Sequence, residues 1–172
     1  MVDQDDRPIG TAGKMEAHEK GLLHRAFSVF IFNSKGEMLL QKRAMDKYHS
    51  GGLWSNACCS HPVPGEEILL AAQKRLKEEM GFEAQLEKLF DFIYEVKFDN
   101  HLKEHEFDHV FVGEYDGEVS INKEEASDFC FKDVKEISQS LQKHPQEYTA
   151  WFRLAFPKAE QWWSHHYKIG VV

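Results

Sequence analysis

A thiol stands two residues from an imidazole in this chain, at Cys59 and His61. Farther along the sequence, the phenol of Tyr94 precedes two carboxylates, Glu104 and Glu106, which are separated by one residue. These four kinds of side chain transfer protons in enzymes, and imidazoles and carboxylates also bind metal ions. The residue types and their grouping therefore indicate a metal-assisted enzyme of acid–base chemistry.

The spacing of the two carboxylates also favours a shared site. If residues 104–106 are extended, both carboxylates point to one side of the strand and His105 points to the other. Taken alone, two acids near a charged hairpin are usually exposed to solvent, and an isolated histidine is usually structural. The functional interpretation depends on the whole set of residues.

Composition limits the classes of protein to which the chain can belong. With 172 residues, 42% hydrophobic and 13% aromatic, it has the size of one ordinary domain with a hydrophobic core. The net charge of −8 argues against a nucleic-acid partner, because nucleic-acid binders usually carry a basic patch. The apolar runs are too short for a transmembrane helix and the acidic N-terminus is not a signal peptide, so we expect no membrane partner.

Three cysteines are an odd number, and two of them are adjacent, at Cys58 and Cys59. This pattern is not a disulfide framework, and a bond between the adjacent pair would be strained. Free thiols are typical of a reducing cytosol, so we expect a cytoplasmic protein. We expect a monomer or a weak homodimer, since Trp162, Trp163 and Tyr167 could either cap the core or form an interface.

Hydrophobic patterns predict strands, then one helix, more strands and finally helices, which is an α+β order. Residues 1–25 are expected to form a largely irregular arm, and residues 44–65 a long functional loop. The central helix begins near residues 64–67 and ends at Gly81. The expected strands are 27–32, 38–42, 86–98, 107–115 and 129–131, and the expected C-terminal helices are 134–141 and 145–165.

The central helix carries charges in a recognisable frame. Arg75 lies one turn before Glu79, so the two side chains can share a face, as ordinary surface pairs also do. Counted from Glu66, the frame resembles the Nudix box, with which that superfamily holds a divalent metal on a diphosphate. The match is degenerate, because the leading glycine of the box falls at Ser60 and its Arg-Glu pair at Lys74 and Arg75. Glu79 remains, and one carboxylate with substrate oxygens suffices for Mg²⁺.

Over residues 10–151 the chain resembles the type I isopentenyl-diphosphate isomerases, enzymes of the Nudix fold. The most specific shared pieces are Cys59-Ser60-His61-Pro62 and Glu104-His105-Glu106. The resemblance implies an α+β fold, a Nudix-type α/β/α sandwich with a mixed sheet and C-terminal helices. Residues 1–172 would form one domain, with residues 1–25 as an arm that contributes metal and phosphate ligands. Further matching pieces are Lys14, His18, His24-Arg25-Ala26-Phe27, Gln41-Lys42-Arg43-Ala44, Lys47, Trp54-Ser55-Asn56, Tyr94 and Ala150-Trp151.

The implied reaction interconverts isopentenyl and dimethylallyl diphosphate by a 1,3 proton shift through a tertiary carbocation. An unactivated alkene is a weak base, so the proton donor must be strong and the pocket dry. We assign Glu106, assisted by Tyr94, as the donor, and Cys59 as the group that removes a proton on the opposite face. A nearby metal would lower the pKa of the thiol. Trp151 would lie over the cationic carbon, although packing in the core would explain it equally well.

The resemblance also implies two metal ions and an anion-binding pocket. The first ion would be Zn²⁺ or Mn²⁺, which suit a mixture of imidazoles and carboxylates. The second would be Mg²⁺, which Glu79 would hold on the diphosphate of a small-molecule substrate. The implied ligands of the first ion are His18, His24, His61, Glu104 and Glu106, and the implied diphosphate-binding residues are Lys14, Arg43, Lys47 and Arg75.

Two other functions remain open at this point. A Nudix hydrolase that cleaves a nucleoside diphosphate would need no thiol and a fuller set of acids in the helical box. A zinc-binding interaction module would need a closed metal shell and no anion pocket. That module would leave Tyr94, Cys59 and the four cations without a purpose.

Overall fold

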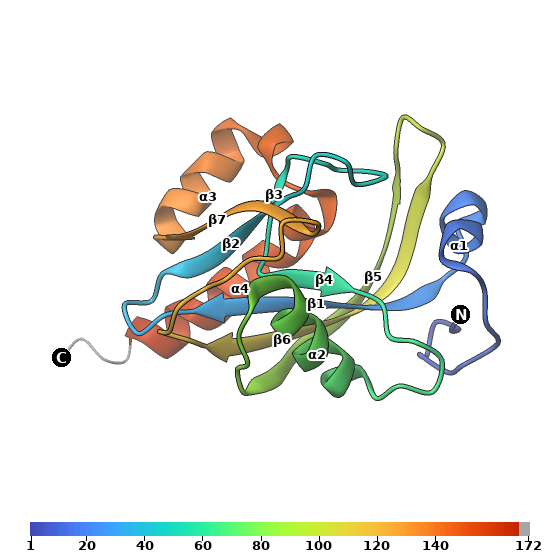
Figure 1. Ribbon diagram of the computed structural model, residues 1–172, viewed down its shortest axis with the longest axis horizontal. Helices are drawn as coiled ribbons and strands as arrows, with labels where there is room; N and C mark the ends of the chain where they lie inside the picture. The colour runs from blue at the N-terminus through green and yellow to red at the C-terminus, as the bar shows by residue number, and fades with distance from the viewer. Residues whose placement is uncertain (169–172) are drawn as a thin grey trace.

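The computed structural model describes residues 1–168, which are built around one mixed β-sheet (Figure 1). The strands are β1 (His24–Phe32), β2 (Met38–Arg43), β3 (Trp54–Ser55), β4 (Cys58–Ser60), β5 (Leu86–Lys97), β6 (Lys103–Glu114) and β7 (Ala126–Lys132). The helices are α1 (Lys14–Lys20), α2 (Ile68–Met80), α3 (Val134–Lys143), the short 3-10 helix Pro145–Glu147 and α4 (Ala150–Lys168).

The sheet divides into two halves where β1 and β2 separate. β1 pairs in parallel with β6 along its whole length and antiparallel with β4. β1 and β2 are paired at Phe32 and Met38, next to their connecting turn, and β2 then pairs with β3 and β7. Beyond the turn the two strands diverge, and side chains of Ser28, Gln41 and Cys59 line the opening between them.

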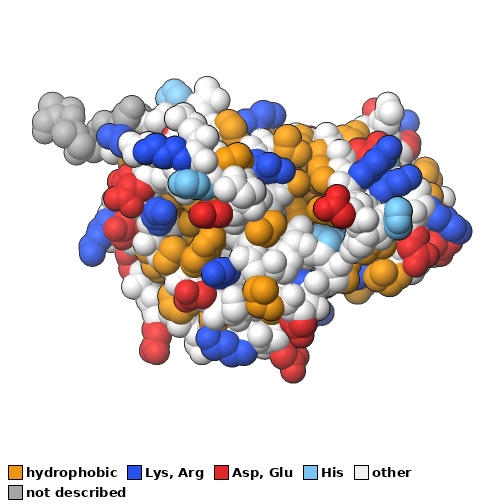
Figure 2. All heavy atoms as spheres, turned by 90° about the horizontal axis from the view of Figure 1, so that it is seen from above, with side chains coloured by type: hydrophobic (Ala, Val, Ile, Leu, Met, Phe, Trp, Pro, Cys, Tyr) orange, Lys and Arg blue, Asp and Glu red, His pale blue; other side chains and the backbone are white. Residues whose placement is uncertain are grey.

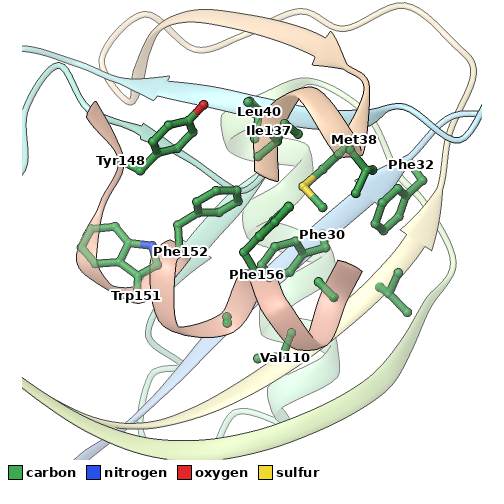
Figure 3. Packing of buried hydrophobic residues seen from close by; sticks show 14 of the residues in the cluster. Phe30, Phe32, Met38, Leu40, Val110, Ile137, Tyr148, Trp151, Phe152 and Phe156 are labelled. Atoms are coloured by element: carbon green, nitrogen blue, oxygen red, sulfur yellow. The ribbon is translucent and has the colours of Figure 1, made fainter. Parts of the chain in front are cut away.

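Alternate residues of the central strands face two separate hydrophobic cores. On β1, Val29 and Ile31 pack with α2, whereas Phe30 and Phe32 pack with α3 and α4. Figure 3 shows the second core, in which Phe152 of α4 stacks on Phe30 with ring centroids 5.9 Å apart. The sheet therefore lies between two helical layers, and the predicted α/β/α sandwich with a mixed sheet and C-terminal helices is confirmed.

The central helix begins and ends where the sequence predicts. Glu67 caps α2 by accepting hydrogen bonds from two backbone N–H groups of the first turn. Gly81 ends the helix with φ of 79°, a left-handed conformation that glycine adopts without steric cost. Leu76 is buried in the core, and this anchors the turn on which Arg75 and Glu79 reach the opening in the sheet.

The hairpin of β5 and β6 is longer than predicted, and this decides where the carboxylates lie. β6 begins at Lys103 rather than at residue 107, because its first residues continue the pairing with β5. Residues 104–106 are therefore extended, as the spacing of the two carboxylates required. Glu104 and Glu106 are buried on one face, and the His105 ring lies near the backbone oxygen of Gly21 instead.

Three other predictions from the sequence missed short elements or a break. The arm 1–25 contains α1, which has only seven residues and is too short to show a reliable period, and it also contributes the start of β1. The loop 44–65 contains β3 and β4, two strands that are stabilised by pairing with β2 and β1 rather than by their own pattern. The predicted helix 145–165 is interrupted, because Tyr148 is extended between the 3-10 helix and α4.

The aromatic residues near the C-terminal end of α4 cap the core. Trp162 packs on Phe32 with ring centroids 5.5 Å apart, and Trp163 Nε1 donates a hydrogen bond of 2.7 Å to the carbonyl oxygen of Gly36. Tyr167 packs against the same cluster. Within residues 1–168, no helix combines the length and apolar character needed to cross a membrane. Figure 2 shows acidic and basic side chains interspersed on one face, with hydrophobic side chains between them.

Candidate active site

A cavity of about 100 Å³ lies where β1 and β2 diverge. All of the predicted catalytic and diphosphate-binding residues line it, together with His61, Glu79 and Glu104. Of the predicted site residues, all of which the structure describes, only His18 and His24 are absent from its wall. These two line a second cavity of about 560 Å³, which also borders His61. The structure thus brings together residues from the arm, both halves of the sheet, α2 and α4.

Four of the predicted metal ligands converge beside the cavity. His61 Nε2 lies 2.8 Å from Glu106 Oε1 and 3.2 Å from His24 Nε2. With His18, one ligand atom from each residue lies within 4.8 Å of every other. Neighbouring ligands around an ion with bonds of ~2.1 Å are roughly 3 Å apart, so these separations are those of a metal shell.

The fifth predicted ligand, Glu104, falls in a different group. Its Oε1 lies 3.0 Å from Nε2 of His49, and these two residues group with His18. The ligand atoms of His24 and His61 are not part of this second group. His18 is therefore the residue that the two groups share.

The histidine rings have the orientation of metal-binding rings. Nδ1 of His18 lies 2.7 Å from the carbonyl oxygen of Lys14, and Nδ1 of His24 lies 2.7 Å from that of Leu22. A ring that donates from Nδ1 presents the lone pair of Nε2 as a ligand. In the described part of the chain, Nε2 of His18 is buried without a hydrogen-bond partner. Burial lowers the pKa of His18 to about 4, so its ring is neutral. These residues fit a divalent metal ion.

Tyr94 joins the two buried carboxylates. Its phenol oxygen lies 2.6 Å from Glu106 Oε2 and 3.1 Å from Glu104 Oε2. Burial, together with the charge of Glu106, raises the pKa of Glu104 to about 8. Burial also opposes the ionisation of Glu106, but without a metal ion its contacts with the imidazoles of His24 and His61 outweigh burial and lower the pKa of Glu106. The environments of the two carboxyls therefore move their pKa values in opposite directions.

Cys59 faces the cavity from β4, directly opposite Ser28 of β1. Its thiol donates to Asn56 Oδ1 at 3.0 Å and lies 3.5 Å from the Ser28 hydroxyl oxygen. Burial and the nearby carboxyl of Asp108 raise the pKa of this thiol. The neighbours of the sulfur are an amide, hydroxyls and an acid rather than cations, so the protein groups alone do not favour the thiolate. All three cysteines lie within the described residues and are free.

Trp151 belongs to both the core and the cavity. It is buried in the cluster shown in Figure 3, and it also lines the cavity wall. Its Nε1 donates a hydrogen bond of 2.9 Å to Ser55 Oγ, which fixes the plane of the ring. The guanidinium of Arg43 lies 5.1 Å from the ring centroid. The Trp151 ring therefore lies next to a positively charged group, the guanidinium of Arg43.

Two of the predicted diphosphate-binding cations share a carboxylate. Glu125 forms ion pairs with Lys47 and with Arg75, whose Nη2 lies 3.2 Å from Glu125 Oε1. The same nitrogen of Arg75 lies 2.8 Å from Glu79 Oε1. Gln41 donates a hydrogen bond of 3.0 Å to the other oxygen of Glu79. The predicted pairing of Arg75 with Glu79 is therefore confirmed, and Glu79 is held in place from two sides.

Lys14 lies close enough to Lys47 and Arg43 for the positive charges to repel one another. Burial and the charges of Lys47 and Arg43 lower the pKa of Lys14. An anion with several charges, bound among these side chains, would remove this repulsion. The cavity therefore has the electrostatic character of a site for a phosphorylated ligand.

The interpretation of the sequence missed His49 and Glu125. His49 lies in the loop 44–65, and the length of that loop was the signal that could have led to it. Glu125 is the second of two adjacent acids, and nothing local distinguishes it from an exposed carboxylate. Both are recognised only by their partners across the cavity.

Comparison with known proteins finds relatives that match nearly the whole chain. It is 50% identical over 164 residues to the Isopentenyl-diphosphate Delta-isomerase of Pectobacterium atrosepticum, covering 95% of this chain and 92% of that protein. It is 52% identical to Isopentenyl-diphosphate Delta-isomerase 2 of Aromatoleum aromaticum, over 88% of this chain and 80% of the relative. Its identity to Isopentenyl-diphosphate Delta-isomerase 2 of Photorhabdus laumondii is 48%, over 94% of each chain.

Solved structures show the same fold at lower identity. DR0079 from Deinococcus radiodurans superposes with a TM-score of 0.76 at 14% identity, over 91% of this chain and 95% of that chain. A MutT protein from Methanosarcina mazei superposes with a TM-score of 0.67 at 19% identity, over 81% and 94%. At such identities the likeness concerns the fold alone. The NUDIX domain family matches residues 22–153. The chain therefore belongs to the NUDIX domain family and, within it, to the isopentenyl-diphosphate Delta-isomerases.

Proposed function

We propose that this protein interconverts isopentenyl diphosphate and dimethylallyl diphosphate, the reaction that transposes a C=C bond at the start of isoprenoid biosynthesis. The observation that carries the proposal is the 50% identity to an Isopentenyl-diphosphate Delta-isomerase over 95% of the chain. The cavity supports it, because a thiol, a carboxylate pair and four cations line the same hollow.

On the carboxylate side of the cavity, Glu106 donates the proton that the alkene gains. The Tyr94 phenol contacts both carboxylates. A proton on Glu104 can therefore pass through the phenol to Glu106 as Glu106 protonates the alkene. A metal ion held by the imidazoles and carboxylates would make the carboxyl a stronger acid.

On the other side, Cys59 takes up the proton that leaves the substrate. Ser28, the strand partner of Cys59, lies four residues along β1 from His24, the partner of Glu106. Four residues of strand span about 13 Å, a distance that two side chains and a five-carbon tail together fill. Each turnover moves one proton from the donor to the acceptor, so the roles of Cys59 and Glu106 exchange in the reverse reaction. In the reverse reaction, the Cys59 thiol is the proton donor and the Glu106 carboxylate is the acceptor.

Between these groups, Trp151 stabilises the carbocation. An aromatic face attracts a cation by about 2 kcal/mol when both are desolvated. The hydrogen bond from Trp151 to Ser55 holds the ring in place during the reaction. Because the ring is nearly completely buried, it also keeps water away from the cation.

At the far end of the substrate, Lys14, Arg43, Lys47 and Arg75 bind the diphosphate. Arginine can bind two oxygens at once, and lysine acts as a point charge. Mg²⁺ bound to Glu79 and to phosphate oxygens would neutralise the remaining charge. Gln41 and Arg75 keep Glu79 directed at this position.

We extend the proposal to the metal ion, the domain organisation, the location and the oligomeric state of the protein. The metal of the His/Glu site is Zn²⁺ or Mn²⁺, since imidazoles and carboxylates suit both ions. Residues 1–172 act as one domain, in which the arm 1–25 supplies Lys14, His18 and His24. The protein works in the cytoplasm as a monomer or weak homodimer, without nucleic-acid or membrane partners.

The proposed function is tested by incubating the purified protein with isopentenyl diphosphate and Mg²⁺ in heavy water. Proton exchange at the reacting carbons should introduce deuterium into both isomers, which NMR detects directly. Recovery of unlabelled substrate after long incubation would contradict the proposal.

A Nudix hydrolase would give a different result in the same heavy-water incubation. It would release phosphate or a monophosphate and leave the C=C bond in place. A thiol-blocking reagent provides the second comparison, because it should stop the isomerase and leave a hydrolase active.

A further inference from the structure

Asp108 is a buried carboxyl that the proposed reaction does not use. It lies on β6 two residues beyond Glu106, with 1% of its surface exposed. Because side chains alternate along a strand, Asp108 points to the same side of the sheet as Glu106. Among residues 1–168, its Oδ1 is buried without a hydrogen-bond partner. A half-satisfied buried acid is costly to folding, so packing alone does not explain its presence.

The other oxygen of Asp108 leads to the thiol of Cys59. Asp108 Oδ2 accepts a hydrogen bond of 2.7 Å from the Ser28 hydroxyl, and this hydroxyl oxygen lies 3.5 Å from Cys59 Sγ. Ser28 is buried and lines the cavity. The carboxyl and the thiol therefore contact the same hydroxyl group.

Pairing of three strands brings these groups together. Ser28 on β1 is the direct partner of Cys59 on β4. On its other side β1 pairs in parallel with β6, where the partner of Asp108 is Ala26. Residues two apart on a strand share a face, so Ala26, Ser28 and Asp108 all lie on the same face of the sheet. The sheet itself thus places an acid, a hydroxyl and a thiol next to one another.

The bond from Ser28 to Asp108 selects one position for the hydroxyl. A serine side chain has three staggered rotamers, which direct Oγ to different places. The bond to Asp108 holds the rotamer in which Oγ contacts the sulfur. Asn56 holds the same sulfur, because its Oδ1 accepts from the thiol at 3.0 Å and its Nδ2 donates to the backbone oxygens of Val29 and Cys58. Two fixed groups therefore direct the thiol.

We propose that Asp108 is a positioning residue for Cys59 and acts through the Ser28 hydroxyl. The role depends on the proposed function, in which Cys59 exchanges a proton with the substrate. Proton transfer requires donor and acceptor at hydrogen-bond distance, so a thiol that turns away slows the reaction without weakening diphosphate binding. Asp108 is not part of the cavity wall, so its effect reaches the substrate only through Ser28.

The test is a double-mutant cycle of Asp108→Val and Ser28→Ala in the metal-loaded protein. Valine suits a strand and cannot bond to the hydroxyl. The first measurement is the rate at which iodoacetamide alkylates Cys59, followed by mass spectrometry. Asp108→Val should change this rate about threefold or more when Ser28 is present, and should leave it unchanged when residue 28 is alanine. Alkylation of Cys130 in the same samples should not change.

The second measurement is kinetic. Asp108→Val should lower kcat for isopentenyl diphosphate about tenfold or more and change KM less than about twofold. Asp108→Asn keeps an oxygen that accepts the serine hydrogen, so it should recover most of kcat. Asp91→Val is the matched control, because Asp91 is an exposed aspartate on β5 that pairs with Lys88. This control should match the wild type in both measurements.

Two results would overturn the proposal. One is an unchanged alkylation rate of Cys59 in folded Asp108→Val. The other is an equal effect of Asp108→Val with and without the Ser28 hydroxyl, because Asp108 would then act on the sulfur directly or on the fold as a whole. Urea denaturation shows whether the variant is folded, and Asp108→Leu replaces it in the cycle if it is not. The alkylation cycle contains no substrate, so its outcome is separate from whether the protein isomerises isopentenyl diphosphate.

Discussion

The phenol of Tyr94 donates its hydrogen to Glu106 across neighbouring strands, with 2.6 Å between the oxygens. The two residues are direct partners in the β5–β6 hairpin. The same phenol oxygen lies 3.1 Å from Glu104. Because a phenol has one hydrogen, Tyr94 cannot donate to both carboxylates at once, and the pair is satisfied when Glu104 carries the shared proton. The β5–β6 hairpin can therefore hold a proton next to Glu106, the proposed proton donor.

Tyr94→Phe should lower kcat about 10–100-fold, since a hydrogen bond to a charged group contributes roughly 1.5–3 kcal/mol. KM for isopentenyl diphosphate should change little, because the phenol contacts the carboxylates and not the cations. Steady-state kinetics measures both constants. Tyr115→Phe is the matched control, since the Tyr115 hydroxyl donates to the backbone of an exposed turn. A raised KM with unchanged kcat would contradict the assigned role.

Cys59→Ala should abolish turnover while the His/Glu metal site remains loaded. The sulfur contacts Asn56 and Ser28 and is not among the grouped ligand atoms, so its loss removes a proton acceptor without removing a ligand. Activity and metal content by elemental analysis are measured on the same sample. Cys130→Ala, on β7, controls for the loss of a thiol. Turnover near the wild-type rate would remove Cys59 from the mechanism.

Arg75→Met should raise KM for the diphosphate substrate at least tenfold. The substitution keeps most of the side-chain volume but removes a fork of donors at the cavity wall. It also leaves buried Glu79 without its cation, so weaker Mg²⁺-dependent binding of inorganic pyrophosphate should accompany it, measured by calorimetry. Lys77→Met on the same helix is the control, because Lys77 is exposed and pairs with Glu83. Equal effects of the two variants would show that general charge, and not the position of Arg75, is responsible.

Glu125→Gln should destabilise the protein in a pH-dependent way. Burial opposes ionisation of Glu125, but the ion pairs with Lys47 and Arg75 outweigh it and lower the pKa below the usual 4.5. A carboxyl whose pKa is lowered by folding contributes stability above its unfolded pKa, and this contribution is lost as the pH falls through the folded pKa. The variant should therefore lose about 1–2 kcal/mol of unfolding free energy at pH 7 and much less near pH 3.

Urea denaturation of the metal-free protein at the two pH values measures this difference. Glu124→Gln, at the neighbouring exposed acid, is the control. A loss of the same size at both pH values would mean that the charge of Glu125 is not what stabilises the loop.

Much of the fold and of the site follows from local pattern. The alternation of Glu104, His105 and Glu106 predicted that both carboxylates share a side, and the spacing of Arg75 and Glu79 predicted their contact. Short elements were missed, since α1 and the strands around Cys59 are too short to carry a period of their own. Their stability comes from pairing and packing with distant segments.

By itself, the sequence determined the residue types available for chemistry, the α+β order of the elements and the membership of the family. Tertiary structure alone decided that Glu104 groups with His49, that Glu125 bridges Lys47 and Arg75, and that Asn56 and Ser28 contact the Cys59 thiol. The physical reason is that a pKa or an unpaired nitrogen depends on burial and on the charges within a few ångströms. Those neighbours come from strands and loops far apart in the chain, so no local pattern records them.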